Sequence, residues 1–209
     1  MERTRRRAQP ETPAASADVR RAVLDGALEI IATQGPDALS MREVARRAGV
    51  SHQAPYHYFG DRAGILAAIT EEGFTKFADS FEEQLRTSDN PLIDCLKMYV
   101  SFALAHPGHY RVMFRSDLSG ADVDGSPAHQ AGERAFQALL DLAATVDEDA
   151  CPEDAMMLPM TLWAHAHGIA TLLLDGPLAS KLPAGTNVDE FVTHIGQYFS
   201  RGIRVHINK

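Results

Sequence analysis

The stretch SMREVARRAGVSHQAPYHYF, residues 40–59, contains the signals of two short helices joined by a tight turn. Ser40 followed three residues later by Glu43 forms a capping box, in which each side chain satisfies an unpaired backbone N–H at a helix start. Gly49 is suited to the positive φ that ends a helix, and Ser51 is of a residue type that caps the next one. The stretch therefore predicts a helix, a turn and a second helix.

The two helices differ in what they present to solvent. The first repeats its apolar residues at three- and four-residue spacing and leaves a basic outer face that includes Arg42 and Arg47. We expect the second to bury Tyr56 and Phe59. Its other side chains are short or planar groups suited to phosphates and base edges: Ser51, His52, Gln53 and His57. This pattern indicates a helix that reads a DNA groove.

Residues 39–66 resemble the DNA-binding domain of TetR-type (tetracycline-repressor-like) transcriptional regulators. The resemblance is carried by Ala45, Gly49-Val50-Ser51, Tyr56, His57-Tyr58-Phe59 and Asp61-Arg62. The DNA-contacting residues that we predict are Arg42, Arg47, Ser51, His52, Gln53, Tyr56, His57 and Arg62. The alternative is an αα-hairpin within a helical bundle, which shows the same caps and turn.

Pro55 departs from the family pattern, which usually has leucine there. Proline removes a backbone hydrogen bond inside a helix, but the loss is smallest in the first turn. We therefore expect a tight or 3₁₀-like start to this helix rather than a break.

Composition favours helices and a soluble protein. Of 209 residues, 45% are hydrophobic and only 7% aromatic, and no valine- and isoleucine-rich run alternates with polar residues. We expect no signal peptide, no transmembrane helix and a cytoplasmic location. Cys95 and Cys151 lie far apart without metal-ligand spacing, so we interpret them as packing or surface residues, with a redox pair as the alternative.

Charge is distributed unevenly along the chain. Residues 1–60 hold nine arginines against seven acidic residues, whereas residues 61–209 hold eleven basic against twenty-one acidic residues. The net charge of −8 therefore comes from the C-terminal part alone. This asymmetry directs nucleic acid to the N-terminal end.

Three domains are expected in an all-α fold of about nine helices. Residues 1–15, with four arginines and two prolines, predict a disordered basic arm, either touching DNA or simply solvated. A helix over about 16–34 completes a helix-turn-helix domain over 16–60. A long helix over about 61–85, capped by its first residue, then opens a helical effector-binding and dimerisation domain over 61–209.

The C-terminal domain is expected to contain five further helices and one mobile loop. The predicted helices span about 90–105, 109–114, 128–146, 152–174 (bent at Pro159) and 188–206, and the predicted loop spans 116–127.

Two motifs mark this C-terminal region. WAHAHGIATLLLDG, residues 163–176, and AHPGHYRVMF, residues 105–114, resemble a ligand-binding domain named for a Trp-His-Gly signature and found in one branch of TetR-type regulators, over about residues 90–205. The resemblance implies a homodimer whose last two long helices form a four-helix interface. The predicted interface residues are Leu162, Ile169, Leu173, Phe191, Ile195, Tyr198 and Phe199.

Aromatic residues from four predicted helices indicate one apolar effector pocket. Its predicted residues are Tyr99, Phe102, Tyr110, Met113, Phe114, Phe136, Trp163 and His167. The alternative is that they are core residues, and His167 then only bonds a buried backbone carbonyl.

Together these features predict a homodimeric repressor that a small apolar or amphipathic effector releases from operator DNA. A helical protein adaptor without DNA binding is one alternative, and a helical enzyme is the other. Neither the pair His106 and His109 nor the pair His165 and His167 has the i, i+4 spacing of a helical metal site, and no phosphate loop or nucleophile motif is present. We expect no catalytic residues, no cofactor and no metal.

Overall fold

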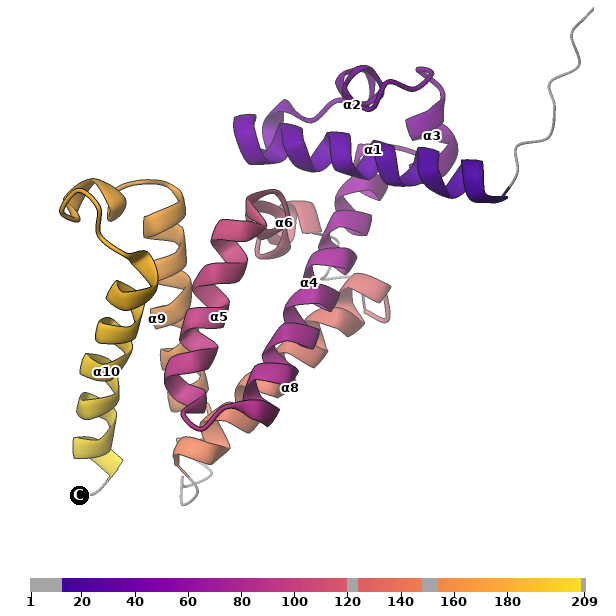
Figure 1. Ribbon diagram of the computed structural model, residues 1–209. Coiled ribbons are helices and arrows are strands. Elements are labelled where there is room, and N and C mark those ends of the chain that lie inside the picture. The colour runs from indigo at the N-terminus through magenta and orange to yellow at the C-terminus, as the bar shows by residue number, and fades with distance from the viewer. Residues whose placement is uncertain (1–12, 120–123, 148–153, 208–209) are drawn as a thin grey trace, which may run out of the picture. The chain divides into compact units, whose positions relative to one another are not determined.

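Helices form throughout the part of the chain that the computed structural model describes, residues 13–119, 124–147 and 154–207 (Figure 1). The all-α prediction is confirmed, and these ranges contain no strand. The α-helices are α1 (Pro13–Gln34), α2 (Met41–Ala48), α3 (Ala54–Phe59), α4 (Arg62–Thr87), α5 (Pro91–Ala105), α6 (Pro107–Met113), α7 (Ser116–Ser119), α8 (Pro127–Val146), α9 (Met157–Leu174) and α10 (Val188–Ile207), and the 3₁₀-helices are η1 (Pro36–Ala38) and η2 (Ala179–Lys181).

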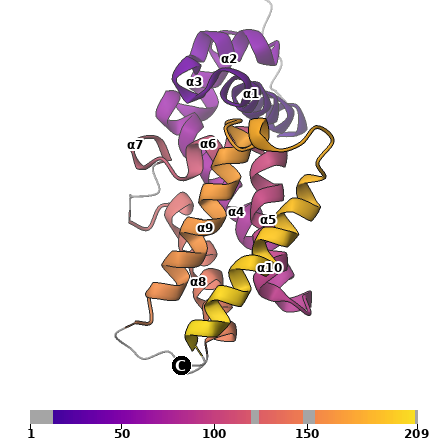
Figure 2. The same cartoon turned by 90° about the vertical axis from the view of Figure 1, so that its left-hand side faces the viewer.

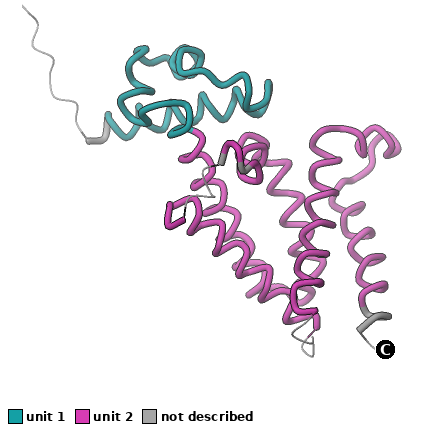
Figure 3. Tube along the Cα trace, turned by 180° about the vertical axis from the view of Figure 1, so that it is seen from behind, with its two compact units in different colours: residues 1–65 teal, residues 66–209 magenta. Residues whose placement is uncertain are grey.

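The chain divides into two compact units, residues 1–65 and 66–209 (Figure 3). In the first unit α1 packs against η1, α2 and α3. Its fully buried residues repeat at helical spacing along one face of α1 and meet the inner face of α2: Val23, Ala27, Ile30, Ile31, Val44 and Ala45. The short helices α2 and α3 are therefore built on α1.

Side chains near the start of α1 reach α3. The hydroxyl oxygens of Ser16 and Tyr58 lie 3.0 Å apart, and the guanidinium of Arg20 stands 5.1 Å from the ring centre of Phe59. Helix α1 begins at Pro13, three residues earlier than predicted and within the predicted disordered arm. The rest of that arm lies outside the described residues.

The second unit is arranged around α5, which packs against α6, α8, α9 and α10, while α8 also packs against α9. Figure 2 shows α9 and α10 in front of α5 and α8. Edge-to-face contacts of Phe77 with Tyr99 and Phe102 join α4 to α5, with ring centres 5.1 and 5.2 Å apart. Helix α4 begins in the first unit and continues into the second as one helix.

Two predicted boundaries in the second unit are wrong. Helix α9 begins at Met157, not near residue 152, and Pro159 occupies its first turn, where the missing N–H costs no helical hydrogen bond. The predicted bend therefore has no basis. The predicted loop over 116–127 contains the short helix α7. Cys151 and Pro152 lie outside the described residues.

Helix α9 is the one described helix that is long and apolar enough to cross a membrane by length and composition. It packs against α5 and α8, and Leu162, Ile169 and Leu173 are among its buried residues. The core helix of a soluble protein meets the same criterion, so this helix is read as part of the core.

Candidate nucleic-acid interface and ligand cavity

The serine cap and the glycine stop predicted for α2 are both present. The Ser40 hydroxyl accepts a hydrogen bond from the backbone N–H of Glu43 at 3.3 Å, and Gly49 has a φ of 66°. The Glu43 carboxylate bonds Arg46 and also pairs with Arg47. The bond from Arg46 lowers the pKa of Glu43. Only one half of the predicted capping box is therefore seen, because arginines occupy the carboxylate.

Helix α3 begins later than predicted. Ser51 caps no helix, because Ser51, His52 and Gln53 form the turn that precedes Ala54. The Ser51 carbonyl accepts the N–H of Ala54 at 3.0 Å. Pro55 is buried in the first turn of α3, where its ring fits without loss of a helical hydrogen bond.

The polar residues of this turn and of α3 form an exposed surface, which we call the reading surface: Ser51, His52, Gln53, Tyr56 and His57. Tyr56 is 56% exposed, so the prediction that it is buried is wrong. Pro55 and the half-buried Phe59 occupy the inward positions instead. A helix of only six residues has room for few inward side chains.

The three arginines predicted to bind DNA have different surroundings. Arg42 is exposed, and no described residue forms an ion pair or hydrogen bond with it. Arg47 is bonded to Glu29 of α1 at 2.5 Å. Arg62 donates to the carbonyls of Pro36 at 2.9 Å and Leu39 at 3.2 Å. Arg47 and Arg62 therefore hold the first unit together, which leaves Arg42 best placed to reach a phosphate.

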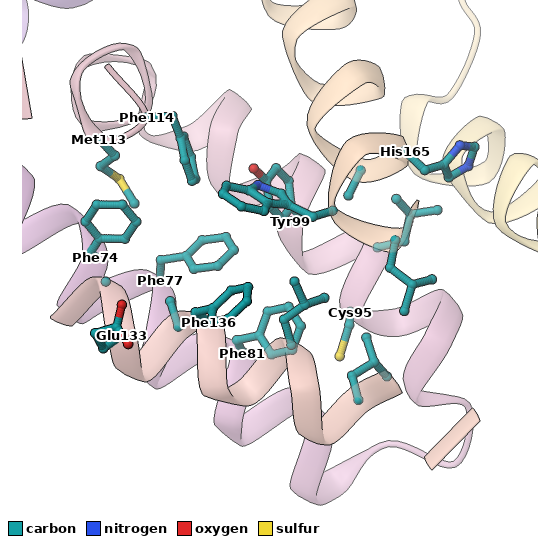
Figure 4. A pocket seen from close by; sticks show the side chains of 18 of the residues that line it. Phe74, Phe77, Phe81, Cys95, Tyr99, Met113, Phe114, Glu133, Phe136 and His165 are labelled. Atoms are coloured by element: carbon teal, nitrogen blue, oxygen red, sulfur yellow. The ribbon is translucent and has the colours of Figure 1, made fainter. Parts of the chain in front are cut away.

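The second unit contains a cavity of about 620 Å³ that is partly open to solvent (Figure 4). Small-molecule sites are typically apolar cavities of about 300–1,000 Å³. Aromatic side chains from five helices, and from the residue that follows α6, form much of the wall: Phe74, Phe77, Phe81, Tyr99, Phe114, Phe136, Trp163 and Phe199. The cavity thus has the size and lining of a ligand site.

Five of the eight predicted pocket residues line this cavity: Tyr99, Met113, Phe114, Phe136 and Trp163. Phe102, Tyr110 and His167 do not line it. The aromatic residues of α4 were missed, although Phe74, Phe77 and Phe81 recur at the spacing of one helix face. That spacing marks a shared face but not the void that the face borders.

Tyr110 and His167 instead form a polar network with Tyr99. His167 Nδ1 lies 2.9 Å from the Tyr99 hydroxyl and 3.0 Å from the Tyr110 hydroxyl, which is also 3.0 Å from Thr171 Oγ1. Burial lowers the pKa of His167 and raises the pKa values of both tyrosines. The network is therefore neutral, and it fixes the Tyr99 ring as part of the cavity wall.

Helices α4 and α6 approach closely beside the cavity. His109 is 5% exposed, and its Nε2 lies 3.3 Å from Glu72 Oε1. Burial lowers the pKa of His109 to about 4. Gly73 faces Met113, which also lines the cavity. Met113 is thus shared between the cavity wall and the contact of α6 with α4.

The predicted dimer residues fall into two groups. Leu162, Ile169 and Leu173 are each 7% exposed and pack within the protomer, which leaves little of their surface for a second copy. Their face of α9 covers the core instead. Tyr198 is 82% exposed, whereas the remaining three pack partly against the core: Phe191, Ile195 and Phe199. Leu172, 47% exposed, was not predicted.

Groups suited to metal or redox chemistry are scarce in the described ranges. Those residues contain no group of three or more His, Cys, Asp or Glu side chains placed to hold a metal ion. Burial raises the pKa of Cys95 to about 12, so its thiol stays protonated and unreactive at neutral pH.

Comparisons with known proteins bear on both units. Residues 23–69 match the model of the bacterial regulatory proteins, tetR family, and residues 92–195 match that of the tetracyclin repressor-like C-terminal domain. The HTH-type transcriptional regulator BetI of Rhizobium meliloti (strain 1021) is 36% identical over 72 residues, which are 34% of this chain and 36% of BetI. The chain thus matches about a third of that relative's length.

Solved structures extend the likeness over most of the chain. A protein with unknown function from Rhodococcus sp. RHA1 is 30% identical, with 96% of this chain and 98% of that chain covered and a TM-score of 0.67. AibR, solved in complex with isovaleryl coenzyme A and operator DNA, is 17% identical, with 84% and 94% covered and a TM-score of 0.61. The two matching models occupy the helix-turn-helix and the cavity-bearing helices, and the chain belongs to the TetR family of bacterial regulatory proteins.

Proposed function

We propose that the protein is a homodimeric transcriptional repressor that binds operator DNA through its first unit and leaves it when a small apolar or amphipathic molecule fills the cavity. The observation that carries this proposal is the reading surface, in which five side chains able to bond bases or phosphates are all exposed. Family membership supports the same function. We propose no catalytic role, and a cytoplasmic location.

DNA recognition is assigned to the reading surface and Arg42. Gln53 has the amide geometry that pairs with adenine in the major groove, and His52 and His57 flank it on the same surface. Arg42 supplies a phosphate contact that is independent of sequence. The acidic C-terminal part repels the duplex, which leaves the first unit as the DNA-binding part.

A dimer follows from the geometry of DNA. Two copies read two half-sites about 34–36 Å apart, which multiplies the specificity of one short helix. On the last two long helices, the large exposed apolar side chains include Leu172 and Tyr198. We propose that these side chains, rather than the buried leucines of α9, meet the second copy.

Helix α4 is the proposed link between ligand and DNA. Arg62 in its first turn holds the carbonyls of Pro36 and Leu39, and further along the same helix Phe74 and Phe77 line the cavity. Because α4 is one continuous helix, a shift of its cavity-lining part is expected to move its N-terminal end as well. A ligand that binds the DNA-free state about 5.5 kcal/mol more tightly than the DNA-binding state nearly inverts the equilibrium between them. A smaller difference in affinity is enough to relieve repression.

Selection of bound sequences from random double-stranded DNA tests the proposal. We expect an enriched, inverted-repeat sequence, and weaker binding to it by Gln53→Ala. Arg86→Ala, which changes an exposed arginine of the second unit, serves as the control. Absence of enrichment contradicts the regulator and favours the adaptor alternative.

Effector action is tested by the reciprocity of coupled binding. A ligand that releases the operator must bind more weakly, by the same factor, when operator is present. Calorimetric titrations with and without the selected DNA measure that factor. Equal ligand affinities in the two titrations contradict release by this route.

A further inference from the structure

The cavity lacks fixed positive charge. No lysine or arginine is among the described residues that line it, and its ionisable lining groups are Asp124, Glu133, His129, His165, Tyr99 and Cys95. Burial lowers the pKa of His165, which favours its neutral form. An anionic ligand would therefore enter this cavity without a fixed counter-ion, and burial of an unpaired charge is costly.

Glu133 of α8 lies at the Phe74 end of the cavity, and His165 lies at the other end (Figure 4). No described residue forms an ion pair or hydrogen bond with the Glu133 side chain. Its neighbour Arg134 is engaged elsewhere, by Asp79 at 2.8 Å and Glu82 at 2.8 Å, both on α4. These carboxylates raise the pKa of Arg134. The Glu133 side chain is exposed, so it provides a carboxylate at the solvent-facing edge of the cavity, and no described protein cation neutralises it.

Aromatic rings continue from that carboxylate into the cavity. The ring centres of Phe74 and Phe114 are 5.5 Å apart, those of Phe114 and Trp163 are 6.1 Å apart, and those of Trp163 and Phe136 are 6.4 Å apart. The electron-rich faces of such rings attract cations, tryptophan most strongly. Hydrophobic surface, ring faces and an unpaired carboxylate together match one chemical class of ligand.

We propose that the cavity selects lipophilic organic cations, with Glu133 as their counter-ion. This inference rests on the proposed function only in treating the cavity as the effector site. It excludes free carboxylates and phosphate-bearing thioesters as preferred ligands of this chain, because the described lining offers them no basic partner. Glu133 is the specificity-determining residue in this proposal.

Two probes of nearly equal shape and opposite charge test the selection: tetraphenylphosphonium and tetraphenylborate. The assay is isothermal titration calorimetry at about pH 8, where ordinary histidines carry no charge. Trp163, the chain's one tryptophan and a lining residue, reports occupation of the cavity by a change in fluorescence. We expect the cation to bind at least about tenfold more tightly than the anion.

Substitution of Glu133 separates charge from shape. Glu133→Gln should weaken binding of the phosphonium about two- to fivefold, because the carboxylate is exposed, and leave binding of neutral triphenylphosphine oxide unchanged. Glu190→Gln, the same change at an exposed position of α10 away from the cavity, should alter neither. Tighter or equal binding of the borate, or unchanged phosphonium binding by Glu133→Gln, overturns the proposal.

The outcome is independent of the DNA experiment. A protein that enriches an operator but binds no phosphonium remains a regulator, and the cation inference fails. A protein that binds the phosphonium through Glu133 but enriches no DNA supports the cation site, and the regulator proposal fails.

Discussion

A methyl group placed on Gly73 of α4 would stand 2.6 Å from the sulfur of Met113 on α6. Cβ atoms do not approach other atoms so closely, so a methyl group at position 73 requires the end of the Met113 side chain to shift. Because Met113 also lines the cavity, the same side chain borders both the cavity and α4. The residue pair therefore couples the cavity wall to the helix that continues from the DNA-binding unit.

Gly73→Ala is expected to be less stable than its matched control by about 1 kcal/mol, because the Met113 side chain must shift to admit the methyl group. The matched control is Gly132→Ala, whose new methyl would lie 3.9 Å from Phe74, an ordinary contact. Both changes gain helix propensity, so the difference in their free energies of unfolding in urea reports the overlap. Equal free energies of unfolding for the two variants would mean that the Met113 side chain moves aside without cost.

Removal of the His167 imidazole should lower the stability of the protein, because buried hydroxyl groups lose a hydrogen-bond partner. His167→Leu leaves the Tyr99 hydroxyl without its 2.9 Å partner, and we expect a loss of about 1–3 kcal/mol in the free energy of unfolding. Tyr99→Phe added to His167→Leu should recover part of that loss, because one hydroxyl that has lost its histidine partner is removed. His194→Leu, at an exposed position, is the control. A loss no larger than that of the control would show that other groups or water satisfy the Tyr99 hydroxyl.

Stability should rise with pH between about 4 and 6.5, in part because of His109. Its pKa of about 4 in the folded protein is below the usual value of about 6.5, so the unfolded state binds more protons within this window. The contribution of neutral His109 to the free energy of unfolding is fully present above about pH 6.5 and is lost as pH falls towards 4. It amounts to at most about 3 kcal/mol. His109→Asn should flatten the slope of unfolding free energy against pH, whereas the exposed His194→Asn should retain it. An unchanged slope in His109→Asn contradicts the assignment.

Arg42 and Arg62 should give opposite phenotypes. Arg42→Ala is expected to leave stability unchanged and to reduce the slope of log affinity against log salt by about 0.9, the contribution of one phosphate contact. Arg62→Ala should cost about 1–2 kcal/mol of stability, since the carbonyls of Pro36 and Leu39 lose a charged donor. Gel-shift titrations between about 50 and 200 mM salt, with urea unfolding of each variant, distinguish the two roles. A reduced salt slope in a stable Arg62→Ala protein would assign that arginine to DNA.

The helix-turn-helix was predictable because its signals are local. A cap at Ser40 and a left-handed residue at Gly49 act within a few positions of chain, and both are seen. The start of α3 was not predictable in the same way. Proline is tolerated both just before a helix and in its first turn, so Pro55 does not fix where α3 begins. The packing of the first unit decides that residues 51–53 form a turn.

The cavity and the proposed dimer face depend on long-range packing. The spacing of Phe74, Phe77 and Phe81 predicts a shared face of α4, but a void appears only where α8 and α9 fail to fill the space opposite. Helix α9 is apolar on most sides, so its sequence does not distinguish a core position such as Ile169 from an outer one such as Leu172. Burial in the protomer decides between them.

Two contacts join the start of α1 to α3: the Ser16 hydroxyl meets the Tyr58 hydroxyl, and the Arg20 guanidinium lies over the Phe59 ring. These contacts help to hold α3 in place. Six residues are too few for a helix to persist alone in water, so α3 depends on its packing against α1 and α2. The backbone amides of α3 should then exchange with deuterium in the same opening event as those of α1. Removing the first two turns of α1 should therefore weaken the reading surface without deleting any residue that we propose to face DNA.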